Sequence, residues 1–533
     1  MKSVGLKPCF AAICPTPTLR SGLLIANTLL DFSPKYNIFR SGLNIQFLLF
    51  LYCLAPFFSF SQNTGNKIQP IAAVTIGAND KSQVIFENSF LDKTMRLDFY
   101  HSGTSTEEHF AIDQIVSDGK WPGSKTQLID NLKLGPYFFE VTDLRTGKFV
   151  YSRGFANIFG EWQTTPEADK TWGTFHESLR FPWPKEEIRV TIKKRDSKNS
   201  FQTIWTTSIN PDSRQVNPAD LTPTHKVDVI LDHGPAAQKL DLVVMGDGYT
   251  QNEMEKFRKD VKRLTDFLIN TEPFKTRMKD INIRAIETPS ETSGVCKPHP
   301  GVFKRTPLSV HYGSFDSERY ALTYDNRTIR DIASEVPYDF MVILVNERTY
   351  GGGGIYNLYT TVSADNKFAN YIMVHELGHH IAGLADEYYT SAVAYEVPEI
   401  TIEPWEANIT ALFDKNNLKW KSLADPETPV PTPWNKEVFD KFGYQIQKER
   451  DSLRSAKVPE NIMENLFDRQ LNKENELFSK EKYQNKVGAF EGGGYSQYGL
   501  YRPELDCIMY TRHIKFCKVC SNTLEAVIDE YAK

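Results

Sequence analysis

The most constraining feature of this sequence is the stretch from Tyr371 to Tyr389, which reads YIMVHELGHHIAGLADEYY. It contains the pattern His-Glu-x-x-His at His375, Glu376 and His379. Residues 370–382 contain no proline and favour a helix, on which residues four apart share one face, so the two imidazoles can bind one metal ion. Glu376, turned by about 100° on the helix, lies beside the open coordination position of that metal. The pattern therefore predicts a zinc-binding helix.

A catalytic zinc site needs a third protein ligand and an open fourth position. Gly383 can adopt the left-handed conformation that ends a helix, and Asp386 follows three residues later. Asp386 could also be an ordinary surface carboxylate, and Glu387 competes with it, because successive side chains of an extended segment point in opposite directions. His380 points away from the predicted metal face. We predict one catalytic Zn²⁺ ion, with ligands His375, His379 and Asp386 and the general base Glu376.

The N-terminal part of the sequence predicts export. Residues 45–58 read IQFLLFLYCLAPFF, a run too short to span a bilayer comfortably. Arg40 precedes it and residues 59–61 form a small-x-small cleavage site, as in a secretory signal peptide. We therefore assign residues 1–61 to a signal peptide with an over-extended start and expect an extracellular, cell-surface or periplasmic protein. A membrane anchor is the alternative, although we expect no stable span in the mature chain.

The net charge bears on whether the chain binds nucleic acid, and the cysteines bear on whether it contains disulfides. The formal net charge of the whole chain is −5, and without a basic excess we expect no nucleic-acid partner. Four cysteines follow the signal peptide: Cys296, Cys507, Cys517 and Cys520. Exported chains favour disulfides, with three possible connectivities here. Cys517-x-x-Cys520 alone could indicate zinc, but no second such pair accompanies it. We therefore favour a disulfide, with Cys507 as a candidate partner.

The distribution of strand and helix patterns predicts two folded parts. Residues 62–208 contain two hairpin patterns, 136–153 and 188–206, and predict a β-sandwich that serves as a binding or spacer module. Residues 209–227 are rich in Pro, Asp and Asn and are predicted to be a linker. From 228 to 533, strand and helix patterns alternate, and we expect one catalytic domain there.

Within this second part, strands are predicted at 239–245 and 340–345. A capping box at Thr250 and Glu253 predicts a helix that runs to about Asn270. Two apolar stripes within 435–485 predict an amphipathic helical hairpin that is inserted into the catalytic domain and borders its cleft. The stripes consist of Val438, Phe439, Phe442 and Ile446, and of Ile462, Leu466, Phe467 and Leu471.

Three further stretches accompany HELGHHIAGLADEY: GGGGIYN at 351–357, EP followed by NIT within 403–410, and EGGGY, YRP and CIM within 491–509. With them, residues 228–533 resemble the bacterial IgA-peptidase family of zinc metallopeptidases. The resemblance implies an α+β chain with a metzincin-like catalytic domain behind a small β-sandwich, and an Asp as third ligand, here Asp386. It also implies a Met-turn at Met509 under the zinc ligands. It does not imply that the chain cleaves immunoglobulin A.

The roles of other residues in these stretches stay open. Residues 351–354 could let a substrate backbone pair with a strand edge, or they could form a flexible loop. A tyrosine could donate to the oxyanion, and the sequence does not choose among Tyr495, Tyr498, Tyr501 and Tyr510.

The sequence therefore predicts a secreted zinc metalloendopeptidase that acts on proteins or peptides, a host protein being one option. One alternative is a non-catalytic surface protein that binds host protein or glycan and carries an idle zinc site. The intact Glu376 argues against it, since a structural site needs no base. The other alternative is a zinc amidase acting on cell-wall material. The oligomeric state is open.

Overall fold

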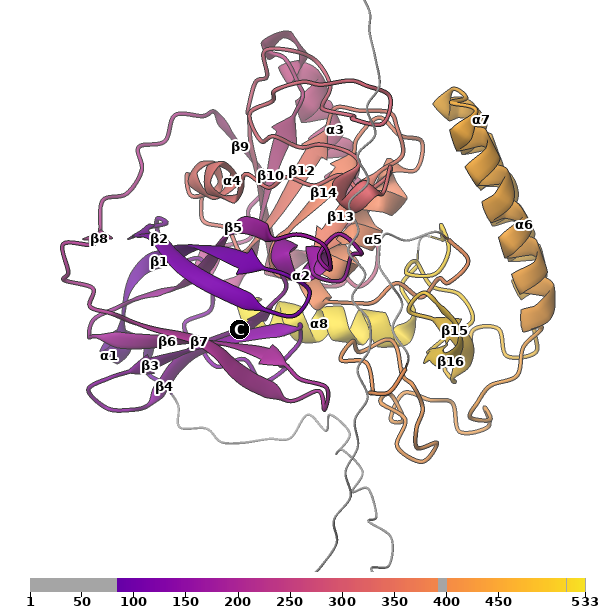
Figure 1. Ribbon diagram of the computed structural model, residues 1–533, viewed down its shortest axis with the longest axis horizontal. Helices are drawn as coiled ribbons and strands as arrows, with labels where there is room; N and C mark the ends of the chain where they lie inside the picture. Colours follow the sequence, from indigo (N-terminus) through magenta and orange to yellow (C-terminus); the bar gives the residue numbers. More distant parts are fainter. Residues whose placement is uncertain (1–83, 392–399, 514, 533) are drawn as a thin grey trace, which may run out of the picture. The chain divides into compact units, whose positions relative to one another are not determined.

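The computed structural model of the chain describes residues 84–391, 400–513 and 515–532 (Figure 1). The predicted signal peptide lies outside the described residues. Among the described helices, none is both long enough and apolar enough to cross a membrane.

The first part of the described chain is rich in β-strands, which form two four-stranded sheets (Figure 1). Alternate side chains such as Ile188, Val190 and Ile192 are buried, and those of both sheets meet in one core. The predicted hairpins are confirmed as β3–β4 and β6–β7. The sheet orders are β5 (Gly173–Pro184), β1 (Phe90–Gly103), β2 (Glu108–Ser117), β8 (Val216–Asn217), and β4 (Phe149–Phe155), β3 (Tyr137–Asp143), β6 (Ile188–Arg195), β7 (Phe201–Ile209).

Two short helices accompany these strands. Helix α1 (Phe86–Ser89) precedes β1, and α2 (Ile158–Trp162) follows β4. The side chain of Asn157 caps α2 by accepting a hydrogen bond of 2.7 Å from the Gly160 amide. Strand β8 lies inside the segment 209–227, which was predicted to be a linker, and pairs with β2. The predicted division into domains stays a prediction.

The second part contains a six-stranded sheet whose four inner strands are mutually parallel. Every side chain of β12 is buried, as expected for a strand covered on both faces. The edge strands β13 and β9 run antiparallel to their neighbours. The order is β13 (Gly352–Ile355), β14 (Tyr359–Ser363), β12 (Phe340–Val345), β10 (Leu240–Asp247), β11 (Ile281–Ile286), β9 (Val227–Leu231).

Helices cover both faces of this sheet (Figure 1). Leu242 and Val244 of β10 face a core built with α3 (Met254–Leu268), α5 (Ala369–Ala382) and α8 (Lys518–Ala532). The alternate residues of β10 face α4 (Asn326–Ala333) and the segment before it. The predicted capping box is confirmed: the Thr250 amide donates to Glu253, at the start of the turn that leads into α3. The β-rich first part and the mixture of helices and strands in the second part agree with the α+β chain expected from the sequence.

The predicted helical insertion is observed as α6 (Lys436–Ser455) and α7 (Glu460–Phe478), which pack against each other (Figure 1). Phe467 of α7 packs on Phe368, just before α5, with ring centroids 5.9 Å apart. Two stripe residues, Val438 and Ile462, are exposed instead of buried, whereas the next residue of each helix, Phe439 or Met463, is buried. Val438 and Ile462 therefore lie on the solvent side of their helices. A short hairpin, β15 (Phe490–Gly493) and β16 (Ser496–Arg502), follows the insertion.

The two parts meet through buried charged groups. The guanidinium of Arg96 in β1 is almost fully buried and donates to Asp118 at 2.8 Å and to Asp331 of α4 at 2.6 Å. Asp118 also accepts hydrogen bonds from Arg180 and from the hydroxyl of Tyr338. These contacts link the β-rich region to the six-stranded sheet.

Candidate metal centre

Helix α5 carries the His-Glu-x-x-His pattern and ends as predicted. Its apolar residues are buried on nearly all sides, so packing holds it firmly against the sheet. Gly383 caps the helix with φ 55° and ψ 34°, the left-handed conformation that glycine adopts without a steric penalty. The chain then turns back toward the helix, which brings Asp386 to the two histidines.

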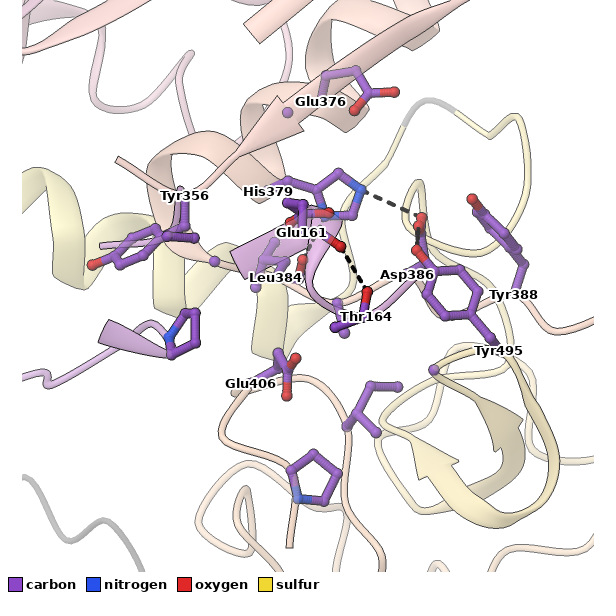
Figure 2. Close-up of a pocket in the computed structure, with 18 of the residues that line it drawn as sticks. Glu161, Thr164, Tyr356, Glu376, His379, Leu384, Asp386, Tyr388, Glu406 and Tyr495 are labelled. Atoms are coloured by element: carbon purple, nitrogen blue, oxygen red, sulfur yellow. Dashed lines mark hydrogen bonds and ion pairs between the residues drawn. The ribbon is translucent and has the colours of Figure 1, made fainter. Parts of the chain in front are cut away.

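The three predicted metal ligands converge on one point. Nε2 of His375 and Nε2 of His379 are 3.2 Å apart. Oδ1 of Asp386 is 3.0 Å from the first and 3.4 Å from the second (Figure 2). Around a tetrahedral zinc with bonds of about 2.0–2.1 Å, neighbouring ligand atoms are separated by about 3.3 Å. The spacing of these three atoms fits a zinc ion.

The hydrogen bonds of the histidines fix which ring nitrogen is available. Nδ1 of His375 lies 2.8 Å from the carbonyl oxygen of Ile508, and Nδ1 of His379 lies 2.5 Å from that of Leu384. A carbonyl only accepts, so each Nδ1 carries the proton and each Nε2 keeps its lone pair. Oδ1 of Asp386 is buried without a hydrogen-bond donor. The lone pairs of these two nitrogens and of the Asp386 oxygen therefore face one another and repel. A cation between them would remove this repulsion.

The electrostatics agree with this reading. Burial opposes protonation of His379, but the Asp386 carboxylate outweighs burial and raises the pKa of His379 to about 9. Burial also disfavours ionised Asp386, but the two histidines outweigh it and hold the Asp386 pKa well below its usual range. Without a metal, the cluster therefore holds a proton where a cation would sit.

Glu376 lies on the same helix and lines the same pocket. Burial raises the pKa of its carboxyl, and the neighbouring histidines oppose that rise. A carboxylate with a raised pKa is a better proton acceptor than an ordinary one, as a general base requires. His380 lies elsewhere, with Nδ1 3.1 Å from the hydroxyl of Thr360, so it does not reach the cluster.

Asp386 and Glu387 face opposite sides of their segment. Asp386 lies at the histidines and accepts a short hydrogen bond from the Tyr495 hydroxyl (Figure 2). Glu387 is fully buried on the other side, where its amide donates to the carbonyl oxygen of Met509 at 2.8 Å. Only Asp386 therefore meets the two histidines.

The segment that contains Ile508 and Met509 packs against α5. Met509 is fully buried, and a Cβ added to Gly378 would lie 2.9 Å from its sulfur. The preceding carbonyl, that of Ile508, accepts from His375. This segment thus sets the orientation of one predicted ligand through the backbone and packs on the helix turn between both histidines.

The cluster opens into a cavity of about 570 Å³, a size typical of ligand sites. Part of its wall comes from the β-rich region, through α2 and its flanks (Figure 2). No described residue of α6 or α7 lines it, so the prediction that the helical insertion borders the cleft is wrong. Lining residues include His375, Glu376, His379, Asp386, Arg319, Tyr388, Tyr495, Gly352, Gly354, Trp405, Glu406, Asn157, Glu161 and Thr164.

Of the four tyrosines considered from the sequence, all of them described, only Tyr495 lines the cavity, where it donates to Asp386. Tyr388 was missed, although it adjoins Glu387 in the sequence. Its hydroxyl accepts a hydrogen bond of 3.0 Å from the guanidinium of Arg319, which lies 69 residues earlier in the sequence. Asn408 was also missed: it bonds both backbone groups of Ala385 and the Glu387 carboxylate. No local pattern signals either contact.

The glycine-rich stretch forms strand β13, not a flexible loop, and its edge is bonded at Gly352. The amide of Gly352 donates to the carbonyl oxygen of Arg319 at 3.2 Å, and its own carbonyl accepts from the amide of Ala321. A substrate therefore cannot pair with the strand at Gly352. The glycines serve another contact: a Cβ on Gly354 would lie 2.2 Å from the carbonyl oxygen of Glu376, so the strand lies directly on α5.

The expected disulfide is not observed. All four cysteines are free thiols, and the sulfur atoms of Cys507 and Cys520 are 3.8 Å apart, beyond the S–S bond length of about 2.05 Å. Cys517 lies in the same buried cluster, whereas Cys296 is elsewhere and half-buried.

Comparison with known families agrees with the site. A family model described as IgA Peptidase M64 matches residues 229–528, and one described as Peptidase M64 N-terminus matches residues 85–206. No curated protein matches the chain. The first match alone covers more than half of the chain, and the family implies a metallopeptidase with protein or peptide substrates. The chain therefore belongs to the M64 peptidase family and is a peptidase, a hydrolase that acts on peptide bonds.

Proposed function

We propose that the chain is an exported zinc metalloendopeptidase with one catalytic Zn²⁺ ion held by His375, His379 and Asp386. The observation that carries the proposal is the convergence of two bare imidazole nitrogens and one unpartnered carboxylate oxygen beside Glu376 in an open cavity. We also propose that the two N-terminal sheets form a β-sandwich and that the following domain is metzincin-like, with its Met-turn at Met509.

In the proposed mechanism a zinc ion supplies Lewis-acid chemistry, making water acidic and polarising the scissile carbonyl. Glu376 accepts a proton from the attacking water and then donates it to the leaving amine. Its raised pKa suits both roles. Tyr388 and Arg319, joined by their hydrogen bond at the cavity wall, are placed to donate to the developing oxyanion.

Family membership favours a peptide bond over the two alternatives, a cell-wall amide and a non-catalytic binding role. The wall contributed by the β-rich region suggests that this region takes part in substrate binding and is more than a spacer. We also propose that the protein is exported, on the basis of the predicted signal peptide, and that its substrate is derived from a host.

The decisive experiment is Glu376→Gln, assayed on a proteome-derived peptide library with and without chelator. The amide cannot accept the proton, so we expect a loss of at least about 10²-fold in kcat, with zinc content and unfolding temperature unchanged. Glu476→Gln on the exposed side of α7 is the matched control and should cleave like the parent protein. Near-full activity of Glu376→Gln would contradict the assigned role of this residue as general base.

A further inference from the structure

A second cluster of metal-binding side chains lies behind the candidate catalytic site. It consists of Glu387, Cys507, Cys517 and Cys520, and one ligand atom from each lies within 4.8 Å of all the others. All four residues are buried to 99 % or more. We propose that this cluster is a closed, structural zinc site with three thiolate ligands and one carboxylate ligand.

The spacing of the donor atoms fits a tetrahedral ion. For Zn–S bonds of about 2.3 Å and a Zn–O bond of about 2.0 Å, the expected separations are about 3.8 Å between sulfurs and about 3.5 Å between sulfur and oxygen. The Cys507 and Cys520 sulfurs are 3.8 Å apart. Oε1 of Glu387 is 3.4 Å from the Cys520 sulfur and 4.0 Å from the Cys517 sulfur.

Backbone amides surround the sulfurs as they do around thiolates. The amides of Met509 and Cys517 donate to the Cys507 sulfur at 3.5 and 3.2 Å. The amide of Cys520 donates to the Cys517 sulfur at 3.4 Å. A neutral thiol is a weak acceptor and a thiolate a strong one, so these donors favour the ionised, metal-binding form.

Neutral thiols alone would leave the Glu387 carboxylate without a cation beside it. Oε1 of Glu387, which faces the sulfurs, accepts a hydrogen bond from Asn408, and Oε2 is buried with no hydrogen-bond partner. Buried charges are paired or bind metals, and a cation bound by Oε1 and the three sulfurs would supply the missing positive charge. By contrast, the grouping of Asp98, Asp113 and His176 is already neutralised by Arg96 and Arg327 and carries no such signal.

The proposed site is closed, since four protein ligands occupy a tetrahedron and leave no position for substrate. Sulfur-rich donor sets select zinc over harder cations. The ion would tie three distant segments together: the turn after α5, the Met-turn and the start of α8. Its role is thus to fix the carbonyls of Ile508 and Met509, which bond His375 and Glu387.

The test separates this site from the catalytic one by using the double variant His375→Ala, His379→Ala of the full chain. The parent protein should contain two zinc ions per chain by elemental analysis, and the double variant one. X-ray absorption at the zinc edge of the double variant should show a sulfur shell at about 2.3 Å. A double variant without zinc, with iron instead, or with no sulfur shell would overturn the proposal.

A thiol count provides an independent readout. Unfolded without reductant but with chelator, the mature chain, which lacks residues 1–61, should present four reactive thiols, whereas a disulfide within the cluster would leave two and contradict the proposal. Cys517→Ser with Cys520→Ser should lose one zinc ion, while Cys296→Ser, the matched control outside the cluster, should lose none. If the cysteine double variant fails to fold, the absorption spectrum of the histidine variant still decides.

Discussion

The adjacent carboxylates of Asp386 and Glu387 lie in different electrostatic surroundings: Asp386 is beside two histidines and Glu387 is beside three cysteines. Burial would raise the pKa of both, but the histidines hold that of Asp386 well below its usual range, whereas the Cys507 sulfur adds to burial and raises that of Glu387. Asp386 and Glu387 are adjacent in an extended segment, where successive side chains point to opposite sides. One carboxylate therefore faces the histidines and the other faces the cysteines. Each carboxylate is thereby committed to one site.

We expect Asp386→Asn to weaken zinc binding at the catalytic site by at least about tenfold. Mutation of a residue that only hydrogen-bonds to a metal ligand already lowers metal affinity by about that factor. Glu387→Gln should leave the affinity of this site nearly unchanged. Competition with a coloured chelator measures both. If both variants lost the same zinc affinity, the assignment of Asp386 alone to the catalytic site would be wrong.

Zinc binding at the catalytic site should depend on pH through His379. Zinc requires the neutral imidazole, while Asp386 raises the pKa of the metal-free His379 to about 9 against the opposing effect of burial. Protons therefore compete below that pH, and the affinity should rise about tenfold per pH unit up to about pH 9. Titrations between pH 6.5 and 10 check this. In Asp386→Asn the plateau should begin at a lower pH than in the parent protein, because burial opposes protonation of His379 and the Asp386 charge no longer outweighs it.

At the scale of elements, the site depends on how closely strand β13 lies on helix α5. Gly354 meets the backbone of Glu376, and no side chain fits between them. At Gly352 the strand edge that the sequence suggested for substrate is bonded by Arg319 and Ala321. A substrate that enters the cavity therefore cannot pair with β13 at this residue.

Gly354→Ala should displace β13 from α5, because its Cβ would lie 2.2 Å from a backbone oxygen that cannot rotate away. We expect a fall in the unfolding temperature together with a loss of kcat, since Glu376 is on the displaced turn. Gly147→Ala, in the β3–β4 turn with open space around it, should cost only about 1 kcal/mol from its left-handed backbone and keep kcat. Thermal unfolding and peptide cleavage, measured on both variants, make the comparison.

The sequence predicted the parts of this site that are local. The spacing of His375 and His379 and the helix end at Gly383 follow from helix geometry, and the hairpins follow from their turn residues. The cavity wall from α2 and the contacts of Asn408 depend on residues far apart in the chain, which no periodicity reports. The cysteine cluster was misread for the same reason, since its fourth member, Glu387, lies 120 residues before Cys507.

For the whole molecule, buried charges couple the β-rich region to the six-stranded sheet. Asp118 accepts from Arg96, Arg180 and Tyr338. Since the β-rich region also forms part of the cavity wall, a loosened junction would alter the substrate site as well as stability.

Asp118→Asn should therefore lower the free energy of unfolding by about 3–5 kcal/mol, because it removes the ion-pair partner of buried Arg180 and one of the carboxylates that pair with Arg96. Arg145→Ala, which breaks the exposed pair with Glu186, should change it by less than about 0.5 kcal/mol. Denaturant titration followed by tyrosine and tryptophan fluorescence measures both. A small effect of Asp118→Asn would show that these charges do not couple the two regions.

The turn between Gly383 and Glu387 has a fixed length as well as a fixed composition. Inserting or deleting one residue there would exchange the sides to which the two carboxylates point, so Asp386 would face the cysteines and Glu387 the histidines. Both clusters would be spoiled by a change that alters no ligand. An engineered version of this turn must therefore keep the number of residues between Gly383 and Glu387.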